Sequence, residues 1–199
     1  MWGRNTLRYI DLNELGTSLG EDLCNAMLFY HALTGCDYTA SFSRTGKVNP
    51  FKLLKKDSVA IEAFATILKS EQSARHAVRS AVKKFVCNLY SKKKLFDLDD
   101  VRLHIFLQKY QSSGRDDAPI SVFKRFDGSM IPPCNSVLEK KIYRAIYVGV
   151  LWKSATSALM PDIDPTDYAW IVKDGGYQIN WYNGDALPAQ LDVAYEREG

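Results

Sequence analysis

Leu33-Thr34-Gly35-Cys36-Asp37-Tyr38 closes an apolar segment, and Arg44-Thr45-Gly46-Lys47 follows shortly after it. The stretch places one glycine and one carboxylate, that of Asp37, at the expected end of a helix, just ahead of a lysine-rich run. A carboxylate there suits a metal site that meets a nucleic-acid backbone. An aspartate at a helix end is also an ordinary cap or turn former. Both interpretations of Asp37 therefore stay open at this point.

Helical spacing of apolar residues extends from this stretch in both directions. Upstream, Asp11 is expected to cap a short helix, and the segment from Glu21 to Leu33 forms the next one, with Gly35 as its stop. Ser58 and Asp97 are expected to cap two of the downstream helices. Apolar periodicity, caps and prolines predict these downstream helices over residues 50–56, 58–68, 72–90, 98–110 and from 135 or 136 to about 157.

The segment 112–133 is polar and holds glycines and a Pro132-Pro133 pair, which predicts a long loop. Near the C-terminus, two alternating runs flank Asp174-Gly175-Gly176 and predict a β-hairpin over 168–172 and 177–181. Its aromatic residues either fill the core of the hairpin or bind a partner; they are Trp170, Tyr177, Trp181 and Tyr182.

The predicted fold is therefore mainly α, with a small C-terminal β-hairpin. We expect a helical region over 1–111 that carries the Gly-Cys-Asp-Tyr motif and basic helices, then the loop 112–133. A long helix and the hairpin, over 134–199, should pack with the first part as one domain. At 199 residues with 46% hydrophobic content, the chain can bury a real core.

Composition excludes several classes of protein. The apolar runs are too short to cross a bilayer, and no apolar signal region opens the sequence. The cysteines Cys24, Cys36, Cys87 and Cys134 form no Cys-x-x-Cys pair, which argues against a zinc knuckle or a disulfide framework. We expect an intracellular protein in which Cys24, Cys87 and Cys134 are buried small apolar groups.

The charge of the chain is unevenly distributed. Residues 44–94 hold thirteen lysines and arginines against three acidic residues, a net charge of +10, although the whole chain carries only +3. Residues 159–199 hold eight acidic residues against two basic ones, a net charge of −6. The basic segment is either a phosphate-binding face or a solvated helical surface paired with the acidic end of the chain.

The segment from Leu28 to Leu68 resembles the flap-endonuclease family and its PIN-like relatives. In that family an apolar helix ends in Gly-Cys-Asp-Tyr, the aspartate helps to bind a catalytic divalent metal, and a Gly-x-Gly hairpin between two helices holds a DNA phosphate through backbone N–H groups. Residues 35–38 match this motif residue for residue. Gly46 stands where the second hairpin glycine would fall, but Arg44 replaces the first.

This resemblance implies a helix-hairpin-helix-like segment and names the candidate site residues. Asp37 would bind Mg²⁺ or Mn²⁺, with further carboxylates needed to complete a site of two metal ions. DNA or RNA phosphates would be contacted by Arg44, Gly46, Lys47, Lys52, Lys55 and Lys56. His31 is expected to be a core or surface histidine rather than a ligand.

A second resemblance covers more of the chain. The order of Ser18-Leu19-Gly20, His31 to Asp37, Pro132-Pro133, Trp152 and Tyr168-Ala169-Trp170 is similar to that in a group of largely uncharacterised animal proteins that look derived from mobile elements. In those longer proteins a PIN-like nuclease region precedes the His-Ala-Leu-Thr-Gly-Cys-Asp motif. The chain would then be the C-terminal portion of a nuclease-like protein.

Two functions follow from the sequence. The first is the nucleic-acid-binding helical portion of a transposon-derived, metal-dependent nuclease, incomplete for catalysis unless a missing N-terminal region or a partner protein supplies carboxylates. The nucleus is then the expected compartment. The alternative is a non-catalytic protein–protein interaction module, in which the acidic, aromatic C-terminal part docks a partner.

Overall fold

The computed structural model describes residues 9–69, 75–91, 93, 95–112 and 128–184. Parts of three predictions lie outside these residues: the start of the 72–90 helix, most of the 112–133 loop, and the acidic end of the chain. The elements are α1 (Leu12–Leu19), α2 (Glu21–Thr34), α3 (Val48–Leu54), α4 (Ser58–Thr66), α5 (Arg75–Tyr90), α6 (Leu98–Ser112), η1 (Gly128–Met130), α8 (Asn135–Lys153), η2 (Pro165–Tyr168), β1 (Trp170–Lys173) and β2 (Gly176–Ile179).

The prediction of a mainly α fold with a small C-terminal hairpin is confirmed. β1 and β2 pair antiparallel, with Trp170 opposite Ile179 and Lys173 opposite Gly176. The expected caps also form where the local signal is clear. The Asp11 carboxylate accepts hydrogen bonds from the backbone N–H groups of Asn13 and Glu14.

Local details differ from the predictions. Asp57, not Ser58, caps α4, and its carboxylate accepts a hydrogen bond from the Ala60 N–H at 3.0 Å. Both residue types cap helices well, so adjacent candidates cannot be ranked from sequence. The α3 helix starts at Val48, two residues before the expected Pro50. Tyr168 belongs to the 3₁₀ turn η2 rather than to the first strand.

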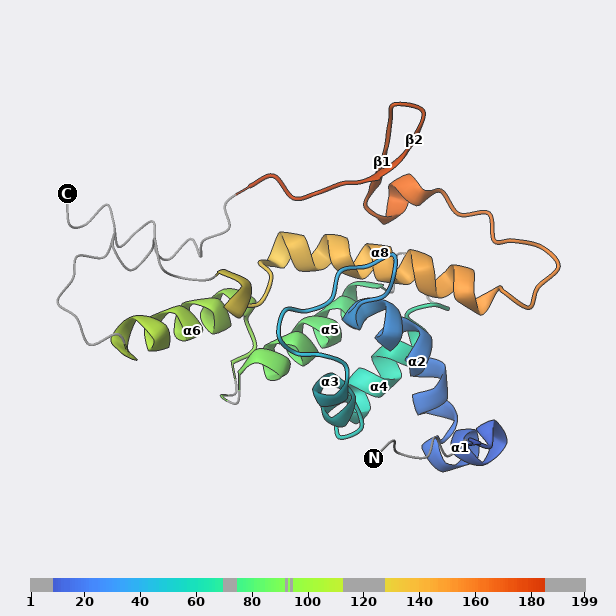
Figure 1. Cartoon of the computed structure of the whole chain (residues 1–199), viewed down its shortest axis with the longest axis horizontal. Coiled ribbons are helices and arrows are strands. Elements are labelled where there is room, and N and C mark those ends of the chain that lie inside the picture. Colours follow the sequence, from blue (N-terminus) through green and yellow to red (C-terminus); the bar gives the residue numbers. More distant parts are fainter. Residues whose placement is uncertain (1–8, 70–74, 92, 94, 113–127, 185–199) are drawn as a thin grey trace, which may run out of the picture.

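The core lies between α2, α4, α5 and α8. Figure 1 shows α8 crossing over the other helices, with the hairpin on its far side. Phe64 stacks edge-on against Phe29 and Phe85, with ring centroids 5.0 Å and 5.1 Å apart. From α8, Ile142 and Ile146 are fully buried in the same cluster. Each such side chain contributes roughly 1.5–3 kcal/mol by leaving water.

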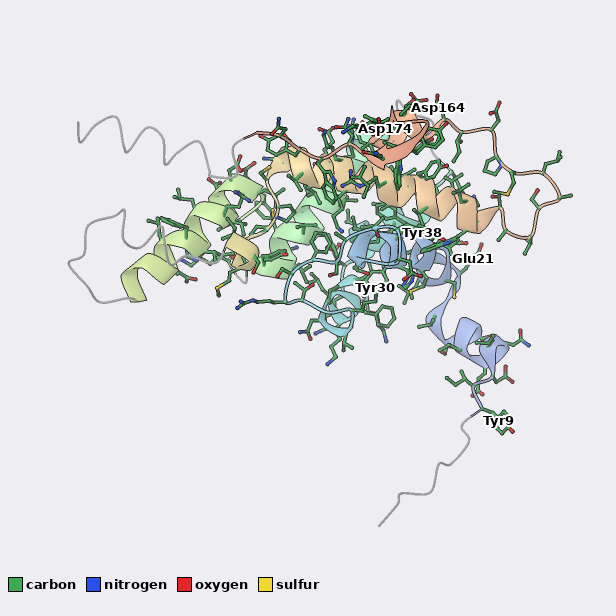
Figure 2. All side chains as sticks on the ribbon, turned by 45° about the horizontal axis from the view of Figure 1, so that its top comes forward. Tyr9, Glu21, Tyr30, Tyr38, Asp164 and Asp174 are labelled. Atoms are coloured by element: carbon green, nitrogen blue, oxygen red, sulfur yellow. The ribbon has the colours of Figure 1, made fainter. Side chains whose placement is uncertain are left out.

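The first helix contacts this core through Leu19 at its C-terminal end. α1 buries none of its residues, and Leu12 and Leu15 are exposed. Figure 1 shows α1 at the edge of the molecule below α2, and Figure 2 shows Tyr9 beyond it. In the part of the chain that the structure describes, no helix combines the length and apolar character needed to cross a membrane.

The aromatic side chains of the hairpin do not form a hairpin core, which was one of the two functions expected for them. Tyr177 is 58% exposed and Trp181 67% exposed. Only Trp170 is half-buried, against Tyr147 of α8. A two-stranded sheet has too little area to enclose such side chains. Among the cysteines, Cys87 is buried as expected, whereas Cys24 and Cys134 are half-buried.

Candidate nucleic-acid interface

Residues 35–47, the site loop, connect α2 to α3 and carry the motif. Gly35 ends α2 with φ of +113°. A Cβ atom at this position would lie 2.6 Å from the Ser41 Cα, so the chain passes too close for any side chain. Glycine is therefore required here both by the backbone conformation and by this close approach.

Asp37 and Tyr38 form the tip of a tight turn. The Cys36 N–H donates to the Thr39 carbonyl at 2.9 Å, and the Thr39 N–H donates back at 3.3 Å. The Thr39 hydroxyl also donates to the Ala32 carbonyl, which ties the turn to α2. Asp37 and Tyr38 are consequently both exposed. The Asp37 carboxylate thus occupies a turn position and remains open to a ligand.

The second half of the loop has a glycine-like backbone at two positions. Arg44 has φ of +59° and Gly46 has φ of +58°. The left-handed conformation costs a residue with a side chain about 1–2 kcal/mol. Arg44, which stands in place of the first hairpin glycine, therefore adopts the backbone conformation that glycine favours. The exposed Gly46 has no heavy atom within 4 Å of where a Cβ would stand.

Lys47, the last residue of the site loop, contacts the C-terminal part of α2. Its ammonium lies 2.5 Å from Nδ1 of His31, and its carbonyl accepts a hydrogen bond from the Tyr30 hydroxyl. The His31 ring lies 5.3 Å from that of Trp152 on α8. Burial and the Lys47 charge lower the pKa of His31, although Asp37 opposes them. His31 is exposed, and it faces Lys47 and Asp37 across the start of the loop.

The other predicted cations lie on α3 and in the turn after it. Lys52 is on α3, and Lys55 and Lys56 follow directly after the helix ends at Leu54; all three are exposed. The Lys55 ammonium lies 5.9 Å from the Phe51 ring centroid. The sequence has no acidic residue between Asp37 and Asp57, and the Asp57 carboxylate is occupied as the cap of α4. The structure thus brings Arg44, Gly46 and these lysines onto one exposed, basic segment.

Long-range contacts hold the loop in place. Phe42 is buried, and its ring lies 6.3 Å from that of Tyr90. Lys141 of α8 donates to the Ala40 carbonyl, and its ammonium lies 4.6 Å from the Phe42 ring centroid. Sequence reasoning missed Lys141, because a lysine in an amphipathic helix is normally read as solvated. It also missed the approach of His31 to Lys47, which no spacing rule predicts.

The described residues hold no group of three or more His, Cys, Asp or Glu side chains that could bind a metal ion. Asp37 therefore offers one ligand here, and Mg²⁺ or Mn²⁺ would need oxygen ligands from elsewhere.

Comparison with known proteins gives no family for the chain: no family model, no curated protein and no solved structure matches it.

Proposed function

We propose that the chain binds the phosphate backbone of a nucleic acid through the site loop and α3, as the helical portion of a PIN-like or flap-endonuclease-like nuclease. The observation that carries the proposal is the exposed row Lys52, Lys55 and Lys56, which continues from Arg44 and Gly46. Exposed cations attract a polyanion and release its counterions. Lys55 shares a hollow with Glu21, Asp22 and Glu62, whereas Lys52 and Lys56 do not line it.

The shape of the loop supports the same function. Gly46 and Arg44 both have left-handed backbone conformations, and open space beside Gly46 leaves room for a phosphate to approach the backbone. The α2, site loop, α3 and α4 order fits a helix-hairpin-helix-like segment. The loop is held by buried Phe42 and by Lys141, so these groups are positioned before a ligand arrives.

Asp37 would act in catalysis only in a completed site. A site of two metal ions needs several carboxylates, and Asp37 supplies one from an exposed turn. The missing ligands would come from an additional N-terminal region or from a partner protein. The described residues alone are then a binding module, and cleavage of nucleic acid requires that second part.

The test compares two double variants that remove equal charge. In Lys52→Gln/Lys56→Gln, affinity for a labelled DNA duplex at about 50 mM salt should fall more than about tenfold, because two phosphate contacts are lost. The control Lys93→Gln/Lys173→Gln removes two exposed lysines elsewhere and should bind like the parent chain. Fluorescence anisotropy measures both. Equal losses in the two variants would show non-specific attraction and contradict the proposal.

One observation favours the second candidate, a protein-interaction module. The hairpin exposes Val172, Tyr177 and Trp181 beside the acidic Asp164, Asp167 and Asp174. Figure 2 shows Asp164 and Asp174 together on the hairpin side of α8. Apolar side chains with an acidic rim suit a partner with a basic surface. A folded sample that binds neither DNA nor RNA at low salt would favour this candidate over the first.

A further inference from the structure

Two neighbouring cations of α8 are buried. Lys141 is 6% exposed and Arg144 is 8% exposed, although lysine and arginine are rarely buried without a partner of opposite charge. They lie three residues apart, so both side chains point to the same side of the helix. This side faces the site loop at Lys141 and the segment after β2 at Arg144.

The contacts of the two cations are incomplete. Lys141 donates to the Ala40 carbonyl and lies over the Phe42 ring, which leaves further N–H donors of the ammonium. The Arg144 guanidinium lies 5.8 Å from the Trp181 ring centroid. Its Nη1 atom is fully covered and has no hydrogen-bond partner among the described residues.

No carboxylate offsets these charges in the described part of the chain. Burial, and then the Arg144 charge, lower the pKa of Lys141 to about 8, and only Cys36 acts in the other direction. Burial alone lowers the pKa of Arg144. The neighbouring acid of α8, Glu139, instead pairs with Arg79 of α5 at 2.6 Å. A buried cation without a counter-charge is strongly unfavourable, and two adjacent ones are more so.

We propose that Lys141 and Arg144 form a binding site for a phosphate-type oxyanion. A guanidinium with an unpaired Nη1 offers parallel N–H donors to two oxygens, and the ammonium adds a second positive charge, which suits a doubly charged anion. The proposal does not rest on nucleic-acid binding by α3. A small phosphate ester supplies such a doubly charged anion, and the phosphodiester of a nucleic acid supplies the same oxygen acceptors with a single charge.

The segment after β2 controls access to this site. Trp181 covers the guanidinium while its own ring remains 67% exposed. Lys140, one residue before Lys141, holds the segment by donating to the Asn180 side chain at 2.7 Å and the Trp181 carbonyl at 3.2 Å. Entry of an anion requires the Trp181 ring to move aside, which the two hydrogen bonds from Lys140 oppose.

The test measures thermal unfolding in phosphate against chloride at equal ionic strength. In the parent chain, inorganic phosphate about 100-fold above its dissociation constant should raise Tm by about 5–10 °C. Arg144→Met should abolish this shift. The control Arg79→Met, which removes an ion-paired arginine, should keep the shift. Equal Tm values of the parent chain in phosphate and chloride, or equal shifts with Arg144→Met, would overturn the proposal.

A second variant and a second readout test the site even if Arg144→Met does not fold. Arg144→Lys keeps the charge but not the two parallel donors, so it should retain a smaller shift. Phosphate should also change a tryptophan fluorescence signal that is lost in Trp181→Phe, and an unchanged signal in the parent chain would count against the site.

Dimethyl phosphate replaces inorganic phosphate in a last experiment, which distinguishes the two sources of the anion. A shift with both anions or with phosphate alone supports a small ligand, and a shift with dimethyl phosphate alone supports a nucleic-acid backbone.

Discussion

Replacing Lys141 by methionine should change how the stability of the fold depends on pH. The Lys141 ammonium is 6% exposed, and its pKa falls from 10.5 to about 8, first because it is buried and second because Arg144 is close. Methionine has a similar length and no charge. The substitution also removes the hydrogen bond to the Ala40 carbonyl, but that loss is independent of pH and shifts the whole curve by a constant.

The sign and size of the effect follow from proton linkage. Below about pH 8 the side chain is charged in both folded and unfolded chains, so the full penalty of burying the charge is present. As pH rises through about 8 towards 10.5, the folded chain releases its proton while the unfolded chain keeps it, and stability rises. Between about pH 7 and pH 9.5 the gain attributable to Lys141 is about 2 kcal/mol.

Urea unfolding of both proteins over this pH range measures the effect. Other groups act in the opposite direction: burial raises the pKa of Cys87 to about 11 and that of Tyr90 to about 12, so their ionisation in the unfolded chain lowers stability at high pH. These contributions are common to both proteins and cancel in the difference. The free energy of unfolding of the parent chain should therefore rise relative to Lys141→Met. Parallel curves would refute the reasoning that Lys141 is buried as a charge.

Three further predictions concern the site loop. Gly35→Ala should destabilise the fold by about 2–4 kcal/mol through strain and the contact with Ser41, whereas Gly16→Ala in α1 should be neutral or stabilising; urea unfolding compares them. Arg44→Gly should be about 1 kcal/mol more stable than Arg44→Ala in the same assay, and equal stabilities would contradict the strained backbone. Asp37→Asn should change DNA affinity by less than about threefold in anisotropy titrations, because exposed charges are screened. It should abolish metal-dependent cleavage once the missing carboxylates are supplied, and cleavage that survives would exclude Asp37 as a ligand.

Local signals predicted much of the fold. The helices follow from the 3.6-residue period of buried side chains such as Phe29 and Phe64, and the hairpin follows from Asp174-Gly175-Gly176. Gly35 was predicted as a helix stop for the right reason, since its backbone conformation suits glycine. These features depend on residues close in sequence, where conformational preference and spacing carry the information.

Contacts between distant parts of the chain could not be predicted. Lys141 and Ala40 are 101 residues apart, and only the packing of α8 on the site loop brings them together. The Trp181 ring lies 5.8 Å from the Arg144 guanidinium of α8, a contact between distant residues that no local pattern encodes. The motif around Asp37 could be located in the sequence, but its setting among Lys47, His31 and Lys141 needed the structure.

The salt dependence of DNA binding tests the central claim most directly. If the site loop and α3 contact phosphates, the logarithm of the binding constant falls linearly with the logarithm of salt concentration. Lys52→Gln/Lys56→Gln should then reduce the magnitude of that slope for a duplex by about 1.8, and Lys93→Gln/Lys173→Gln should leave it unchanged. A slope that is the same in the parent chain and in Lys52→Gln/Lys56→Gln would show that α3 does not contact the backbone and would contradict the account.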